Sequence, residues 1–178
     1  MPENLLPLRL VVVLAVVVVL QETVAAGITI DGVHPDLVLL LCTVTGMVGG
    51  AEQGAVIGFV GGLATDLFLT TPLGLSALSY AIIGYAVGTV REGIIHPTWW
   101  LTPVTAAVAS GGGVALYALA GAITGQSDML QYGLARTVVV VAIINAVLAL
   151  PMLPFVRWAL TPPGRRSSGS LSRGVMGR

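Results

Sequence analysis

One carboxylate stands at the end of an apolar segment and is the strongest candidate in this chain for a functional group. Asp66 follows Gly54, Gly58 and Gly62 at a constant spacing of four, so these residues share one face of a predicted helix. An ionisable group in a membrane segment suggests function, because a charge is costly away from water. The alternative is structural, since Asp66 lies close enough to the segment end to cap the outer turn and touch headgroup water. The sequence leaves both interpretations open.

The two histidines are weaker candidates for a metal site. His34 lies two residues from Asp36, and His96 lies four residues from Glu92, and a metal ion can use either spacing. Neither pair has a third ligand nearby, so we expect no metal there, and the Glu92–His96 pair is more simply a loop beside a helix start. Cys42 is the only cysteine, which excludes an internal disulfide and a cysteine cluster.

The sequence carries no recognisable pattern for catalysis. It has no Gly-x-Ser-x-Gly, no phosphate-binding loop, no HExxH and no nucleophile–base pattern. Arg136 and Asn145 are suited to pair with acids across a helical bundle, but their positions do not indicate which acids. We therefore predict a protein that is not an enzyme and that uses no cofactor.

Small residues line one side of two neighbouring apolar segments and predict a helical hairpin. The second segment repeats them at steps of four, three and four, at Ala77, Ala81, Gly84 and Gly88. Such spacing lets helices approach closely in a membrane. The joint over residues 70–74 breaks the helix, because Pro72 lacks a backbone donor and Gly74 accepts unusual backbone angles. We favour internal packing for these glycines over docking of a partner.

The composition is typical of a membrane protein. Of 178 residues, 56% are hydrophobic and only 9% are charged, whereas soluble domains carry roughly 25% charged residues. The mean hydropathy is +0.96. The net charge is zero, and all eight basic residues are arginines, so the chain shows no nucleic-acid-binding footprint.

Six apolar segments predict an all-α membrane protein. We expect helices over about 5–20, 35–48, 52–69, 75–90, 99–123 and 134–156. The second segment is shorter than the roughly 17–25 residues that a spanning helix needs, so it either thins the bilayer or lies partly inside the bundle. Three glycines at 111–113 let a neighbour come close or a kink form.

The two ends of the chain carry further expectations. We predict a six-helix transmembrane domain over 1–160 and a disordered cytoplasmic tail over 161–178, because the sequence from Trp158 onward is rich in Pro, Gly, Ser and Arg. The alternative for the first segment is a cleaved signal peptide, with Arg9 before an apolar core and residues 24–26 as the cleavage site.

The arginines predict the orientation in the membrane. Six spans place both chain ends on one side, and that side then holds seven arginines: Arg9, Arg91, Arg157, Arg165, Arg166, Arg173 and Arg178. Only Arg136 lies opposite. The positive-inside rule therefore places both termini in the cytoplasm.

Two other residue types agree with this orientation. The three tryptophans, Trp99, Trp100 and Trp158, fall at the predicted cytoplasmic helix ends, where aromatic belts lie. The predicted external side is acidic, with Glu22, Asp31, Asp36, Asp66 and Asp128.

The hairpin also carries a family resemblance. The run from Asp66 to Leu78, DLFLTTPLGLSAL, with Tyr80 and Gly84-Tyr85 after it, resembles the rod shape-determining protein MreD family, as do PDLVL at 35–39 and the segment from Gly58 to Gly62. The similarity covers about 5–160 and includes the size and helix count. Its most specific part is the D-x-x-x-x-x-P-x-G pattern of Asp66, Pro72 and Gly74.

The resemblance implies a bacterial cell-membrane protein of the elongation machinery that makes peptidoglycan. Members of this family work with the bitopic protein MreC, the MreB cytoskeleton, the glycosyltransferase RodA and a class B penicillin-binding transpeptidase. They are regarded as scaffolds without catalytic residues. Asp66, Pro72 and Gly74 carry over as motif positions only.

A rival interpretation is the substrate-binding membrane subunit of an energy-coupling-factor vitamin transporter, which is also a six-helix bundle of similar size. Those subunits usually carry Ala-x-x-x-Ala in their first helix, whereas here Ala15 is followed four residues later by Val19. We also expect these helices to supply too few polar groups for a buried ligand site. The fold analogy does not fix the function.

Overall fold

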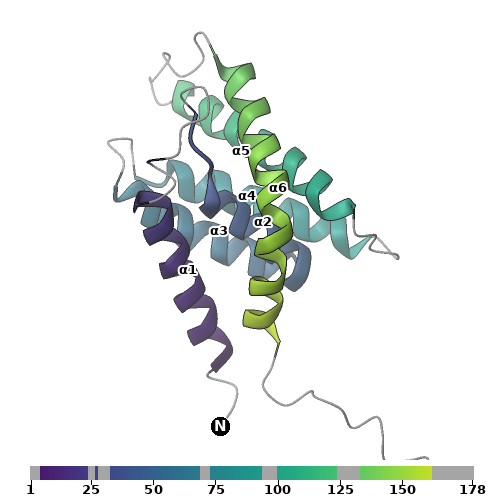
Figure 1. Cartoon of the computed structure of the whole chain (residues 1–178). Coiled ribbons are helices and arrows are strands. Elements are labelled where there is room, and N and C mark those ends of the chain that lie inside the picture. Colours follow the sequence, from purple (N-terminus) through teal and green to yellow (C-terminus); the bar gives the residue numbers. More distant parts are fainter. Residues whose placement is uncertain are drawn as a thin grey trace, which may run out of the picture.

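The computed structural model describes residues 5–23, 27, 33–68, 73–93, 100–123 and 133–161. Over these residues the chain is all-helical, as predicted (Figure 1). Its six helices are α1 (Leu5–Thr23), α2 (Leu37–Gly49), α3 (Ala51–Asp66), α4 (Leu75–Glu92), α5 (Leu101–Ile123) and α6 (Leu134–Leu160).

The short helix α2 forms the centre of the fold. Every residue from Val38 to Met47 is buried, and α2 contacts each of the other five helices. A helix that is apolar on all sides is expected to be enclosed by protein. Its 13 residues extend only about 20 Å at 1.5 Å per residue. Of the two alternatives for this segment, the structure shows the one in which it lies inside the bundle.

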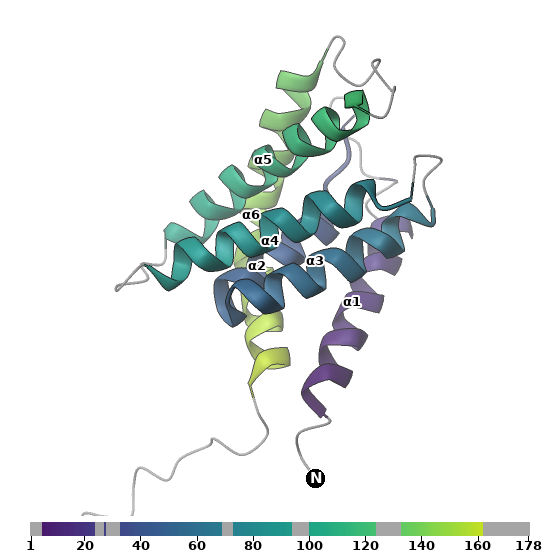
Figure 2. The same cartoon turned by 180° about the vertical axis from the view of Figure 1, so that it is seen from behind.

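Helices α3 and α4 form the most extensive helix pair and lie side by side across α1 and α6 (Figure 2). Helix α5 continues without interruption through its three glycines. A Cβ atom on Gly113 would lie 2.7 Å from the Leu39 side chain, so this glycine lets α5 pack closely against the central helix.

Three predicted helix ends were wrong. Helix α1 continues to Thr23, because the Gln21 amide binds the backbone before α2. Helix α3 ends at Asp66 instead of near residue 69, and Leu67 and Phe68 form a turn. Helix α6 continues through Pro151 and Pro154 to Leu160, so Trp158 is helical and does not belong to a disordered tail.

The end of α6 is fixed by contacts with α1. The Arg9 guanidinium lies 5.1 Å from the centre of the Trp158 ring and donates a 3.2 Å hydrogen bond to the Thr161 carbonyl. The Thr161 hydroxyl donates to the Arg157 carbonyl at 2.6 Å. These contacts join the first turns of α1 to the last turn of α6.

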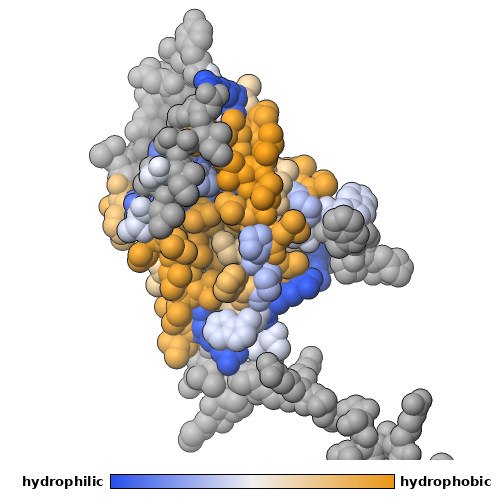
Figure 3. All heavy atoms as spheres, viewed as in Figure 1, coloured by the Kyte–Doolittle hydropathy of each residue, from blue (hydrophilic) through white to orange (hydrophobic). Residues whose placement is uncertain are grey.

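The outer surface is apolar. Figure 3 shows hydrophobic residues over most of the described face, with hydrophilic residues gathered toward its ends. Exposed apolar side chains occur on several helices and include Val12, Val16, Phe59, Val108, Ile143, Val147 and Phe155. Within the described residues, α5 and α6 are long and apolar enough to cross a membrane.

Candidate functional site

The carboxylate of Asp66 binds the start of the next helix. It accepts hydrogen bonds from the backbone N–H groups of Gly74 at 2.7 Å, Ser76 at 3.1 Å and Ala77 at 3.4 Å. The first N–H groups of a helix have no partner within the helix, and its positive end attracts an anion. Asp66 is only 1% exposed. It therefore caps α4 from inside the fold, whereas the structural alternative in the sequence analysis was a cap of the outer turn in contact with headgroup water.

A second carboxylate makes the reciprocal contact at the other end of the hairpin. Glu92, the last residue of α4, accepts a 3.2 Å hydrogen bond from the backbone N–H of Ala51, the first residue of α3. Each helix of the pair thus ends in an acid that binds the first turn of its neighbour.

The predicted small-residue stripes meet between these two caps. A Cβ atom on Gly58 or Gly62 of α3 would lie under 3.0 Å from the backbone of α4, and one on Gly84 or Gly88 would lie equally close to α3. A Cβ atom on Gly46 of α2 would likewise lie under 3.0 Å from the carbonyl oxygen of Gly84. These glycines face other helices of the chain. Gly74 lies in the turn with a φ of 99°, whereas Pro72 is outside the described residues.

A polar centre that the sequence analysis did not identify lies at the start of α2. One Asp36 carboxylate oxygen accepts from the Leu39 N–H at 2.9 Å and so caps α2. The other accepts from the Tyr80 hydroxyl at 2.6 Å. The sequence placed Asp36 among the external acids, but its side chain links α2 to α4 inside the bundle.

Two amides hold the backbone around Asp36. The Gln21 side chain donates to the Pro35 carbonyl at 3.1 Å and accepts from the Leu37 N–H at 2.8 Å. Asn145 donates to the Asp36 carbonyl at 3.0 Å and to the Ser110 hydroxyl at 2.9 Å. The sequence suggested that Asn145 pairs with an acid. Its amide binds the backbone carbonyl of an acidic residue, Asp36.

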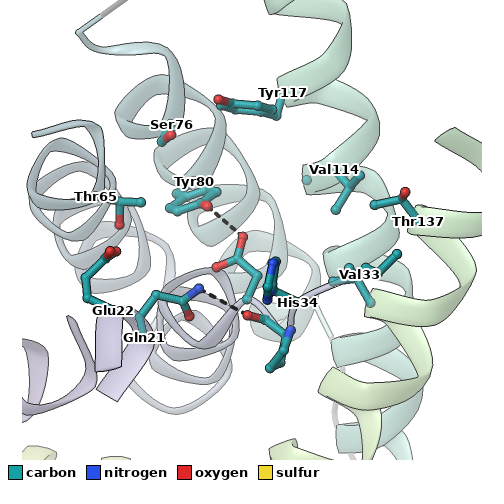
Figure 4. Close-up of a pocket in the computed structure, with 14 residues that line it drawn as sticks. Gln21, Glu22, Val33, His34, Thr65, Ser76, Tyr80, Val114, Tyr117 and Thr137 are labelled. Carbon is teal, nitrogen blue, oxygen red and sulfur yellow. Dashed lines mark hydrogen bonds between the residues drawn. The ribbon is translucent and has the colours of Figure 1, made fainter. Parts of the chain in front are cut away.

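A cavity of about 400 Å³ opens beside this polar centre (Figure 4). Its walls come from the end of α1, residues 33–36 and helices α3 to α6, and include Gln21, Glu22, His34, Asp36, Thr65, Ser76, Tyr80, Val114, Tyr117 and Thr137. The fold gathers polar groups around this cavity from six segments, whereas the sequence analysis considered the helices one at a time.

A second cavity of about 410 Å³ lies between α1 and α6 and is almost entirely apolar. Its walls include Val13, Val16, Leu148, Met152 and Phe155. No three His, Cys, Asp or Glu side chains among the described residues are grouped to hold a metal ion. His34 and Asp36 therefore gain no third ligand there, and His96 is outside the described residues.

The comparison with protein families identifies the chain. The sequence model of the rod shape-determining protein MreD matches residues 3–160. The chain belongs to the MreD family. Comparison with curated proteins and with solved structures gave no match.

Membership of the MreD family shows a role in determining rod shape and a location in the membrane. The apolar outer surface fits that location. The family match spans all six helices, so the capped hairpin, the Asp36 centre and the polar cavity all lie within the matched region.

Proposed function

We propose that this MreD-family chain is a non-catalytic membrane scaffold of the peptidoglycan-synthesising elongation machinery. In this proposal it binds a bitopic MreC-like partner and helps to maintain rod shape. The family match over residues 3–160 carries the proposal. The outer surface supports it, because apolar side chains on several helices offer mainly lateral packing to neighbours in the membrane.

The proposal extends to the remaining members of the machinery. The scaffold would connect the MreC-like partner with RodA and a class B penicillin-binding protein in the membrane, and with the MreB cytoskeleton on the cytoplasmic side. Membrane lipid would cover the rest of the apolar surface. These partners are those that work with the family, and the chain's small size leaves helix faces and short connections as its contact surfaces.

The proposed topology has six membrane passes in the bacterial cell membrane, with both termini cytoplasmic. The contact between Arg9 and Trp158 supports it, because it places the first turns of α1 and the last turn of α6 at the same end of the bundle. Residues 1–160 would form the membrane domain and 161–178 the cytoplasmic tail. Residues 162–178 of this tail and residues 24–26, proposed as a signal-peptide cleavage site, lie outside the described residues.

The hairpin motif would contribute to partner binding through its shape. Asp66 is buried and its carboxylate already accepts three N–H groups, so direct recognition of its charge is not the role that we propose. Asp66 and Gly74 would fix the joint that carries Pro72, and Gly58, Gly62, Gly84 and Gly88 would keep the two helices together. A partner would then bind a rigid hairpin face.

Depletion of the protein in its own bacterium tests the proposal. We expect rod-shaped cells to round or widen and new wall synthesis to disperse, while vitamin uptake stays normal. Cells that keep their rod shape but lose the uptake of one vitamin would contradict the scaffold. That result would favour the transporter subunit, which no specific observation supports. The partner is tested separately, by co-purification of the MreC-like protein in mild detergent.

A further inference from the structure

The polar cavity has the size and the unfilled hydrogen-bonding capacity of a ligand site. Its volume of about 400 Å³ lies within the range of roughly 300–1,000 Å³ that is typical of small-molecule pockets. Ser76 lines it and is 1% exposed, yet its hydroxyl has no hydrogen-bond partner among the described residues. Buried hydroxyl groups are normally paired, so this one is left with hydrogen-bonding capacity that a molecule bound beside Ser76 would fill.

The charges around the cavity favour a cation. Two carboxylates, those of Glu22 and Asp36, line it together with the His34 imidazole, and no arginine does so among the residues that the structure describes. Asp36 is held in place by Tyr80 and by the Leu39 N–H, but an ionised carboxylate has about four acceptor positions, so it retains capacity for a ligand. Glu22 makes no hydrogen bond or ion pair with any described residue, and its side chain is exposed.

Aromatic rings complete the arrangement. Figure 4 shows Tyr117, Ser76 and Tyr80 above Glu22 in this view, and all four line the cavity together with Asp36. The face of a tyrosine ring attracts an organic cation. The hydrogen bond to Asp36 fixes the position of the Tyr80 ring. Carboxylates, tyrosine rings and an unpaired hydroxyl together match an ammonium group better than a phosphate or a carboxylate.

We propose that this cavity binds a small ammonium group, supplied either by a free amine or by the ethanolamine headgroup of a phospholipid. Glu22 and Asp36 neutralise the positive charge, Tyr80 and Tyr117 contact it, and the Ser76 hydroxyl accepts a hydrogen bond from it. This site is proposed independently of the scaffold function, since it is argued from the cavity lining alone.

Two binding measurements on the purified full chain test this site and distinguish the sources. Ethanolamine is titrated into the detergent-solubilised protein by calorimetry, with inorganic phosphate as the anionic probe. Native mass spectrometry then compares retention of phosphatidylethanolamine and phosphatidylglycerol added in equal amounts. Binding of ethanolamine assigns a free amine, whereas selective retention of phosphatidylethanolamine without ethanolamine binding assigns the lipid headgroup. Binding of neither, or preferential binding of phosphate or phosphatidylglycerol, overturns the proposal.

Two variants separate the site from the fold. Glu22→Gln removes one charge from the cavity and should weaken binding about tenfold or more, since a charge-assisted hydrogen bond is lost. Ser76→Ala should also weaken binding without lowering the melting temperature of the free protein, because its hydroxyl has no hydrogen-bond partner within the described part of the chain. Glu52→Gln is the matched control, an exposed acid at the start of α3 that does not line the cavity. Unchanged binding in Glu22→Gln, or an equal loss in Glu52→Gln, overturns the assignment.

Discussion

The carboxylate of Asp66 lies 2.7 Å from the backbone nitrogen of Gly74 and ties the last residue of α3 to the turn before α4. Two further N–H groups in the first turn of α4 bind the same side chain. Gly74 has a φ of 99°, a conformation that favours glycine. In this conformation its N–H donates to Asp66, so the acid and the glycine of the motif form a single contact. The spacing between them sets the length of the joint.

Asp66→Asn should therefore destabilise the protein. The amide keeps one oxygen and replaces the other acceptor with a donor, so at least one buried N–H group loses its partner. We expect a loss of about 1–3 kcal/mol in the free energy of unfolding, the range for hydrogen bonds to charged groups and for helix caps. Thermal unfolding in mild detergent measures it.

The same variant tests how the hairpin affects partner binding. Direct recognition of the Asp66 charge by the partner would make Asp66→Asn weaken co-purification without lowering the amount of protein in the membrane. The buried position of Asp66 changes this expectation, because loss of partner should now follow loss of stability. Glu52→Gln serves as control, and a variant with unchanged melting temperature but no bound partner would contradict the structural role.

The glycine stripe gives a second prediction. Gly58→Leu or Gly62→Leu should destabilise the hairpin by about 3 kcal/mol or more, because overpacking forces the two helices apart. Val60→Leu should have little effect, since Val60 lies on the same helix and is 46% exposed. The amount of folded protein in the membrane and its melting temperature measure the difference. Full stability of both glycine variants would show that the stripe does not pack against α4.

Tyr80 tests the polar centre. Tyr80→Phe removes the hydroxyl that donates to Asp36 at 2.6 Å and should cost about 1–2 kcal/mol, because a buried carboxylate oxygen loses its donor. Tyr85→Phe is the matched control, since Tyr85 is on the same helix and is 55% exposed. Chemical unfolding of the two variants compares them, and equal stability would exclude a structural role for the Tyr80–Asp36 bond.

The sequence predicted the helices better than the contacts between them. Long apolar runs separated by glycine and proline located all six helices, and the spacing of Gly58 and Gly62 identified the face that packs. The errors were at ends where polar side chains bind distant backbone. Gln21 remains helical because it binds residues 14 and 16 positions later. Periodicity within one segment carries no information on such contacts.

The Asp36 centre was missed for a similar reason. Its partners, Tyr80 and Asn145, are 44 and 109 positions away, and the sequence predicted only that this carboxylate lies on the external side. Glu92 was interpreted as a loop residue near His96, whereas it caps Ala51, 41 positions earlier. The predicted helix over about 35–48 agrees with α2, which begins at Leu37. That α2 is enclosed by the other five helices followed only from the assembled fold.

The last prediction concerns topology. Six passes with both ends cytoplasmic require the joint after α3 and the connection after α5 to be external. Reporter domains fused after Thr71 and Ser127 should therefore give an external signal, and one fused after Glu92 a cytoplasmic signal. The physical basis is the arginine distribution together with the contact between Arg9 and Trp158, which brings the start of α1 and the end of α6 together.

The fusion after Glu92 is the internal control, because it follows Arg91 in the last turn of α4 and shares the helices before it with the Thr71 fusion. A cytoplasmic signal at Thr71 would contradict the six-pass arrangement. Mass spectrometry of the mature N-terminus tests the remaining alternative, since cleavage near residues 24–26 would remove α1 and leave five passes. Retention of α1 is expected, because Leu14 and Val17 are buried in the hydrophobic core beside α2, and their loss would expose that core.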